Sequence, residues 1–298
     1  MNVLRLLTAL LVSLLLFSCG DGSEAYDATG SFEATEIIVS SQANGRILAL
    51  DVEEGDQLRA GQAVGQIDSL QLYLQKMGLL SNVEGVRAQQ PDIRKQTAAI
   101  REQISTQERE RERVKSLLVA NAANRKQLDD IESQIEVLRG QLSASTSTLE
   151  KNSRNISAQS STLEIQVAQL NDQLEKTQII SPISGTVLNR YAEAGELATM
   201  GTPLFKIADT NTLFLRAYVT NDQLAQIKLN DPVAVRVDDG QGGMRSYDGK
   251  ISWISDKSEF TPKTIQTKNE RANLVYALKI AVINDGFLKI GMYGEVKF

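Results

Sequence analysis

The sequence predicts an elongated α+β chain in which a long antiparallel α-helical coiled-coil hairpin is inserted into a split β-domain and followed by a small β-barrel. Three observations predict this fold. A short β-type motif occurs twice, a seven-residue apolar repeat fills the region between the copies, and short strands separated by Asn, Asp and Gly turns occupy residues 209–298. An antiparallel hairpin returns the chain to its starting point, so the two copies are expected to lie side by side.

The duplicated motif covers residues 45–68 and 185–208, at a constant offset of 140 residues. Apolar residues alternate at strand spacing in both copies. Neither copy has enough strand to bury a face alone, so we expect residues 35–69 and 179–208 to form one small sandwich or flattened barrel. The glycines that repeat in register are interpreted as structural turn positions, and they are Gly45/Gly185, Gly55/Gly195 and Gly61/Gly201.

Residues 70–178 predict the hairpin. Apolar residues recur every seven positions in its second half, at Leu128, Ile135, Leu142, Leu149, Ile156, Leu163 and Leu170. The partner series starts apolar and then turns polar, at Ile131, Leu138, Ser145, Asn152, Gln159, Gln166 and Gln173. This pattern favours a two-helix coil with a narrow seam that is partly hydrophilic.

The first arm of the hairpin has a weaker repeat and contains Pro91. Because proline interrupts a helix interior but is tolerated in its first turn, we expect this arm to be irregular before Gln90 and straight after it. The chain is expected to reverse over residues 117–124, with Asn121 or Asn124 as the N-cap of the second helix.

The composition excludes several classes of function. Histidine is absent, Cys19 is the only cysteine, and the net charge is −5. The usual zinc sites, an intrachain disulfide and Ser-His-Asp or Cys-His catalysis are therefore excluded, and no basic footprint suggests nucleic acid. We expect a protein that is not an enzyme and has no cofactor or metal.

The first nineteen residues predict a secretory signal. An apolar run over residues 6–17 follows Arg5 and is shorter than the roughly 20 residues that span a bilayer. Leu16-Phe17-Ser18-Cys19 resembles the bacterial lipobox, which implies acylation of Cys19 and a mature chain that starts there, with residues 20–34 as a flexible tether. A plain signal peptide with an incidental cysteine is the alternative.

The duplicated motif resembles the halves of the lipoyl/biotinyl carrier domain, and the whole arrangement resembles periplasmic adaptor subunits (membrane fusion proteins) of the HlyD type. The resemblance implies a lipoprotein in the periplasm, favouring the inner membrane, that links an inner-membrane transporter to a TolC-like outer-membrane channel and forms a trimeric or hexameric ring. A true carrier domain is disfavoured because neither copy ends in a Met-Lys pair and Lys76 lies beyond the strand end.

The hairpin tip resembles the Arg-x₃-Leu-x₆-Ser pattern of adaptors that dock onto such channels. Arg113, Leu117 and Asn124 have this spacing, with Asn in place of Ser. The resemblance implies a docking role for these three residues. The alternative is that Leu117 packs the tip, Asn124 caps a helix and Arg113 is solvated.

Residues 209–298 are expected to form the β-barrel domain. Residues 258–280, "SEFTPKTIQTKNERANLVYALKI", resemble adaptors that accompany ATP-binding-cassette (ABC) exporters. The chain stops soon after "GMYGEVKF", which leaves little room for the further domain of adaptors paired with proton-driven pumps. Two alternatives stay open, namely an adaptor of a proton-driven pump and a structural lipoprotein spacer without a transport partner.

Overall fold

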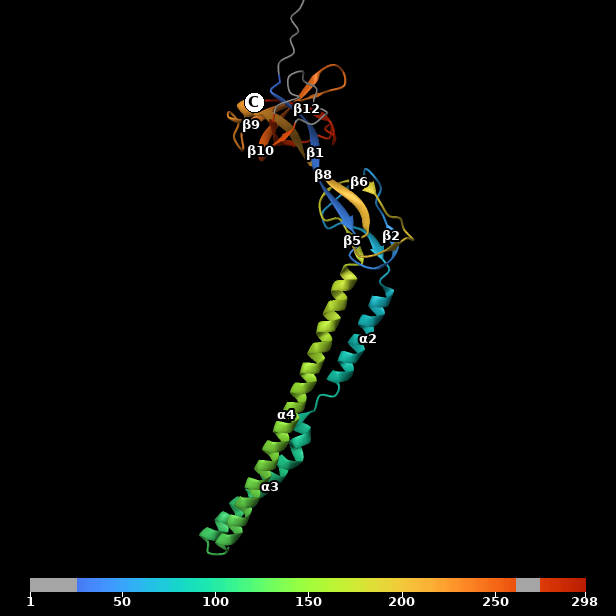
Figure 1. The fold of residues 1–298 in the computed structure, drawn as a ribbon. Helices are drawn as coiled ribbons and strands as arrows, with labels where there is room; N and C mark the ends of the chain where they lie inside the picture. The colour runs from blue at the N-terminus through green and yellow to red at the C-terminus, as the bar shows by residue number, and fades with distance from the viewer. Residues whose placement is uncertain (1–25, 261–273) are drawn as a thin grey trace, which may run out of the picture.

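The computed structural model describes residues 26–260 and 274–298. The molecule is elongated, with a helical hairpin at one end, a split β-domain in the middle and a β-barrel at the other end (Figure 1). This arrangement confirms the predicted fold class. The signal segment and Cys19 lie outside the described residues.

The hairpin consists of helices α2 (Leu70–Arg87), α3 (Ile93–Val119) and α4 (Arg125–Glu175). Helix α4 has 51 residues and is about 76 Å long at 1.5 Å per residue. It packs against both α2 and α3. All seven residues of the heptad series in α4 are buried or half-buried, with Ile135 and Ile156 the most buried. The series therefore marks the seam between the two arms.

The second row of the seam differs from the prediction. Beyond Ser145 it lies one residue later than a strict heptad places it, at Ser153, Ser160, Val167 and Leu174. The polar residues predicted there are exposed, namely Asn152, Gln159, Gln166 and Gln173. The reason is that a helix with 3.6 residues per turn drifts by about 20° per heptad. The predicted placement of these four residues in the seam is therefore wrong. Val167 and Leu174 make the seam apolar near the split domain, whereas Ser153 and Ser160 keep part of it hydrophilic, as predicted.

The first arm is also more regular than predicted. Helix α2 is continuous, and the interruption is confined to residues 88–92. Pro91 precedes Asp92, the N-cap of α3, whose carboxylate accepts the backbone N–H of Lys95 at 3.1 Å. Polar contacts with α4 hold the interruption in place, since Arg87 contacts Glu164 and Gln90 donates to Ser153 Oγ at 2.9 Å.

The split β-domain is built from both copies of the motif. The first copy supplies β2 (Gly45–Leu50), β3 (Gln57–Leu58) and β4 (Ala63–Ile67), and the second supplies β5 (Gln178–Ile180), β6 (Gly185–Arg190) and β7 (Leu197–Ala198). The copies bond to each other reciprocally. The Gly55 N–H donates to the Val187 carbonyl at 2.9 Å, and the Gly195 N–H donates to the Ile47 carbonyl at 2.8 Å. Val187 and Ile47 also lie in one hydrophobic core, so the two copies form a single domain.

The barrel consists of β1 (Ala28–Ser40), β8 (Pro203–Thr220), β9 (Pro232–Asp238), β10 (Met244–Phe260), β11 (Leu274–Ile283) and β12 (Tyr293–Lys297), with the short helix α5 (Asn221–Leu224) after β8. The strand order is β1-β12-β9-β10-β11-β8, and β1 pairs back with β8 to close the barrel. Both β1 and β8 continue into the split domain, so two strands join the β-domains.

The expectation of a flexible tether over residues 20–34 is wrong for residues 28–34. They form the first half of β1, which pairs with β12 on one side and β8 on the other. Phe32 is 1% exposed in the barrel core. Gly30 permits the close pairing, because a Cβ there would lie 2.0 Å from the Arg216 carbonyl oxygen. The barrel therefore contains residues 28–34 as well as strands after residue 209.

Candidate functional site

The hairpin tip exposes two apolar side chains in the last turn of α3. Leu117 is 38% exposed and Val119 is 88% exposed, whereas Leu118 between them is half-buried. Within residues 26–260 and 274–298, no other large apolar side chain is as exposed as Val119. Sequence reasoning missed Val119. The sequence carries no signal for it, because its exposure depends on where the chain leaves α3.

Arg113 lies one turn before Leu117 and is paired within its own helix. Its Nε and Nη2 donate to the two carboxylate oxygens of Glu110 at 2.9 and 2.6 Å. The hydrogen bond from Arg113 lowers the pKa of the Glu110 carboxyl, and the same contact raises the pKa of the guanidinium. The side chain of Arg113 is largely exposed and that of Glu110 is partly exposed. Surface ion pairs of this kind contribute little, so Arg113 can exchange Glu110 for another carboxylate.

Asn124 is the N-cap of α4. Its Oδ1 accepts the Lys126 N–H at 3.0 Å, and its own N–H donates to the Gln127 side chain at 3.3 Å. Of the two candidates for this cap, Asn121 instead takes a left-handed backbone with φ 55° in the turn. The geometry gives Asn124 a clear structural role at the site where the family pattern has a docking residue.

Replacing Asn124 with alanine should loosen the first turn of α4 by about 1 kcal/mol, because the cap bond is lost. The expected result is faster hydrogen exchange at the amides of Lys126 and Gln127. Asn124→Asp is the matched control, since it keeps an oxygen acceptor and should keep the protection. Equal protection in the alanine variant would contradict the capping role.

The charge around the tip is positive. Residues 111–126 include one acid, Glu112, and the five bases Arg111, Arg113, Lys115, Arg125 and Lys126. This contrasts with the negative charge of the whole chain. An exposed apolar pair within a basic collar suits a partner surface that is apolar at its centre and acidic around it.

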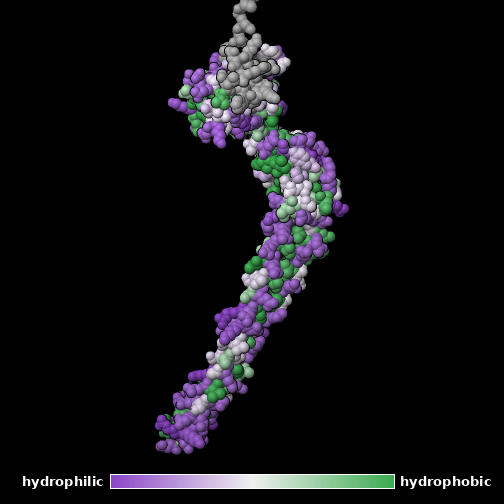
Figure 2. Space-filling view, in the orientation of Figure 1, coloured by the Kyte–Doolittle hydropathy of each residue, from purple (hydrophilic) through white to green (hydrophobic). Residues whose placement is uncertain are grey.

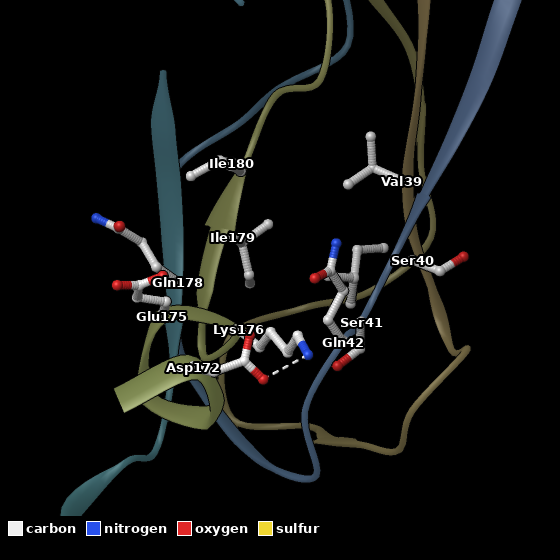
Figure 3. A pocket seen from close by; sticks show the side chains of 11 residues that line it. Val39, Ser40, Ser41, Gln42, Asp172, Glu175, Lys176, Gln178, Ile179 and Ile180 are labelled. Carbon is white, nitrogen blue, oxygen red and sulfur yellow. Dashed lines mark hydrogen bonds and ion pairs between the residues drawn. The ribbon is translucent and has the colours of Figure 1, made fainter. Parts of the chain in front are cut away.

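The foot of the hairpin forms a second notable feature, a cavity of about 260 Å³ between the last turn of α4, strand β5 and the end of β1 (Figure 3). Asp172 and Lys176 line it and pair with each other at 2.7 Å. Beside it, the buried Thr177 hydroxyl donates to the Leu174 carbonyl at 2.6 Å and accepts from Gln66 Nε2 at 2.8 Å. These bonds connect the end of α4 to the split domain and set the direction of the hairpin.

The six glycines predicted at turns lie in the split domain, at the opposite end of the hairpin from the tip (Figure 1). Gly55, Gly61, Gly195 and Gly201 have φ between 78° and 98°. A Cβ on Gly185 would lie 2.1 Å from the Ala208 carbonyl oxygen, so this position is restricted by close backbone approach instead. These glycines therefore shape the domain.

A pair of buried serines escaped the sequence reasoning. Ser41 and Ser181 are 3% and 0% exposed, and their hydroxyls donate to the carbonyls of Ala43 and Ile183 at 2.6 and 2.7 Å. They have the same offset of 140 residues as the glycines, so extending the repeat toward the N-terminus of each copy would have found them.

Metal-binding clusters and membrane-spanning helices are both absent from the parts of the chain that the structure describes. No group of acidic, cysteine or histidine side chains there could hold a metal ion. No helix there is both long enough and apolar enough to cross a membrane.

Residues 35–210 match the family described as "RND MFP, barrel-sandwich hybrid domain". Among curated relatives, the UPF0194 membrane protein YE2891 of Yersinia enterocolitica is 27% identical over 327 residues, covering 100% of this chain and 99% of the relative. The UPF0194 membrane protein YbhG of Salmonella gallinarum is 27% identical over 299 residues, covering 93% of this chain and 89% of the relative.

Two solved structures resemble the fold. MacA from Actinobacillus actinomycetemcomitans has a TM-score of 0.54 at 21% identity, covering 90% of this chain and 76% of MacA. The membrane fusion protein Spr0693 from Streptococcus pneumoniae has a TM-score of 0.50 at 18% identity, covering 90% of this chain and 96% of Spr0693. At identities this low, the two likenesses show a shared fold and nothing more.

Proposed function

This chain belongs to the membrane fusion proteins with an RND-type barrel-sandwich hybrid domain, and from that premise we propose that it links an inner-membrane transporter to a TolC-like outer-membrane channel. Proteins of this family are non-enzymatic periplasmic adaptors of efflux-type systems, and they oligomerise. Energy for export therefore comes from the transporter, and this chain supplies the connection.

The observation that carries the proposal is the position of the exposed tip. Leu117 and Val119 lie at the end of α3, next to the start of an α4 helix about 76 Å long, while both feet of the hairpin rest on the split domain. A rigid arm with an apolar, basic end can reach a partner far from the β-domains. Arg113 and Leu117 are proposed as docking residues, Val119 is added to them, and Asn124 holds the turn.

A photo-cross-linking amino acid at position 119 tests the docking. In cells, it should form a covalent adduct with an outer-membrane channel subunit, identified by mass spectrometry. The matched control is position 137, where Val137 is 55% exposed on α4 away from the tip. An adduct at 137 in place of 119, or none at either, would reject docking through the tip and favour a structural spacer.

We propose further that the transporter is an ABC exporter. Support comes from the resemblance of residues 258–280 to adaptors of such exporters. The family description names RND proteins, so a proton-driven pump is the second candidate. Export that continues after the proton gradient is collapsed and stops on ATP depletion would support the first candidate, and the reverse pattern would support the second.

We also propose that acyl chains on Cys19 hold the mature chain at the inner membrane. The lipobox-like sequence before Cys19 supports this, and several acyl chains suffice for stable anchoring. The mass of the N-terminal peptide tests it. An unmodified peptide starting elsewhere would support the plain signal peptide.

A further inference from the structure

The barrel has one end that lies farthest from the hairpin. Strands β1 and β8 pair along both the barrel and the split domain, so Ala28 and Thr220, where they end in the barrel, lie at this far end (Figure 1). Asp27 joins two further segments there. Its carbonyl accepts Gln223 Nε2 of α5 at 2.6 Å, and its carboxylate accepts the N–H of Phe298, which follows β12, at 2.9 Å. The starts of β1 and α5 and the end of β12 therefore meet at one place.

Large apolar side chains are exposed at this end of the barrel. Leu229 lies in the turn between α5 and β9, and the first residues of β9 pair with the end of β12. Leu274 begins β11, which contacts α5. The exposed fractions are 55% for Leu229, 53% for Leu274, 44% for Tyr26 and 42% for Phe298. We name these four side chains the entry face. Exposed apolar side chains gathered at one end of a domain mark a contact surface.

The charge beside the entry face is balanced. Lys228 and Lys297 are exposed there, and so are Asp27 and Asp222. Burial of apolar surface, and not attraction to a charged partner, would therefore drive a contact of this face. Aromatic and leucine side chains suit the boundary between the headgroups and the acyl chains of a bilayer, and lysine side chains can extend from that boundary to the headgroups.

The chain between Cys19 and the entry face is short. Tyr26 is the seventh residue after Cys19, and an extended residue spans at most about 3.6 Å, so Tyr26 stays within about 25 Å of the acyl chains proposed on Cys19. A short tether gives the entry face a high effective concentration at the bilayer surface, where even a weak apolar contact is populated. The tether therefore favours lipid as the occupant of this face.

We propose that the entry face binds the bilayer surface, with its apolar side chains at the boundary between headgroups and acyl chains. Acyl chains alone hold the chain at the membrane but leave the barrel free to turn on its tether. Contact through the entry face fixes this end of the barrel on the bilayer and directs the hairpin, at the opposite end of the molecule, away from it (Figure 1). The surface toward the tip is mostly hydrophilic, which suits an arm directed into water (Figure 2). The inference rests on the proposed acyl anchor at Cys19.

Trp253 is the only tryptophan of the chain, so a single fluorescent reporter can be moved to the entry face. The full chain with Trp253→Phe and Leu229→Trp is acylated in cells and reconstituted into phosphatidylcholine vesicles. Interfacial side chains lie about 5–10 Å into the headgroup and acyl boundary, so lipid brominated near the top of its acyl chains should lower the emission at least about twofold. The matched control is Val137→Trp in the same background. Val137 is as exposed as Leu229, at 55%, but lies on α4, and its emission should not change.

Adding Tyr26→Asp and Phe298→Asp should remove the quenching at position 229, because two carboxylates then oppose entry into the bilayer. An acylated protein whose emission at 229 ignores the brominated lipid overturns the inference and leaves the anchor intact, whereas an unmodified Cys19 rejects the anchor and the inference together. A photo-cross-linking amino acid at 229 that forms adducts in cells with protein and none with phospholipid also overturns it. Docking of the tip is tested separately by the adduct at position 119.

Discussion

Replacing both Leu117 and Val119 with aspartate should abolish export by cells that depend on this protein. Burial of a leucine or valine side chain contributes about 1.5–3 kcal/mol, and an unpaired carboxylate in an apolar contact adds a further cost. Together these terms exceed about 4 kcal/mol, which corresponds to about a thousandfold weaker binding to the channel. In the isolated chain Val119 is 88% exposed and Leu117 is 38% exposed, and neither belongs to the buried core.

The measurement is survival on toxic compounds to which deletion of the gene sensitises cells, together with recovery of the channel on affinity purification. Val137→Asp places one carboxylate on an exposed part of α4 away from the tip and should leave both readouts unchanged. Circular dichroism checks that the hairpin remains helical. Normal survival of the double aspartate variant would mean that the chain acts as a spacer or docks elsewhere.

Most of the β-architecture could be predicted because its signals are local and repeated. The glycines at one offset of 140 residues predict two equivalent half-domains, and the reciprocal bonds of Gly55 and Gly195 follow from that equivalence. The strand over residues 28–34 could not be predicted this way. Its sequence, "ATGSFEA", is short and contains one large apolar residue, Phe32, and it becomes a strand because β8 and β12 pair with it from both sides.

The hairpin shows where periodicity alone is insufficient. A strict repeat of seven finds the first row of the seam, but the second row shifts from Ser145 to Ser153, eight residues on, as the helix drifts relative to its partner. The same limit applies at the tip. Val119 belongs to α3 and precedes both rows of α4, so only the path of the chain around residues 120–124 reveals its exposure.

Gly185→Ala is expected to be the most damaging single-methyl change in the split domain. The added Cβ would lie 2.1 Å from the Ala208 oxygen and 2.7 Å from its carbon, and neither backbone atom can rotate away. Separating β6 from β8 to relieve the contact should cost about 3 kcal/mol or more. For a small domain, this lowers the unfolding temperature by at least about 10 °C, measured by calorimetry.

Gly195→Ala in the same copy separates this contact from ordinary backbone strain. It has φ 97° and no atom within 4 Å of its added methyl, so it should cost only about 1–2 kcal/mol. Equal losses in the two variants would contradict the close approach at Gly185. Because residues on both sides of the hairpin build this domain, its loosening also releases the feet of α2 and α4 from each other. Gly185→Ala should therefore weaken channel capture as temperature rises, although every residue of the tip is intact.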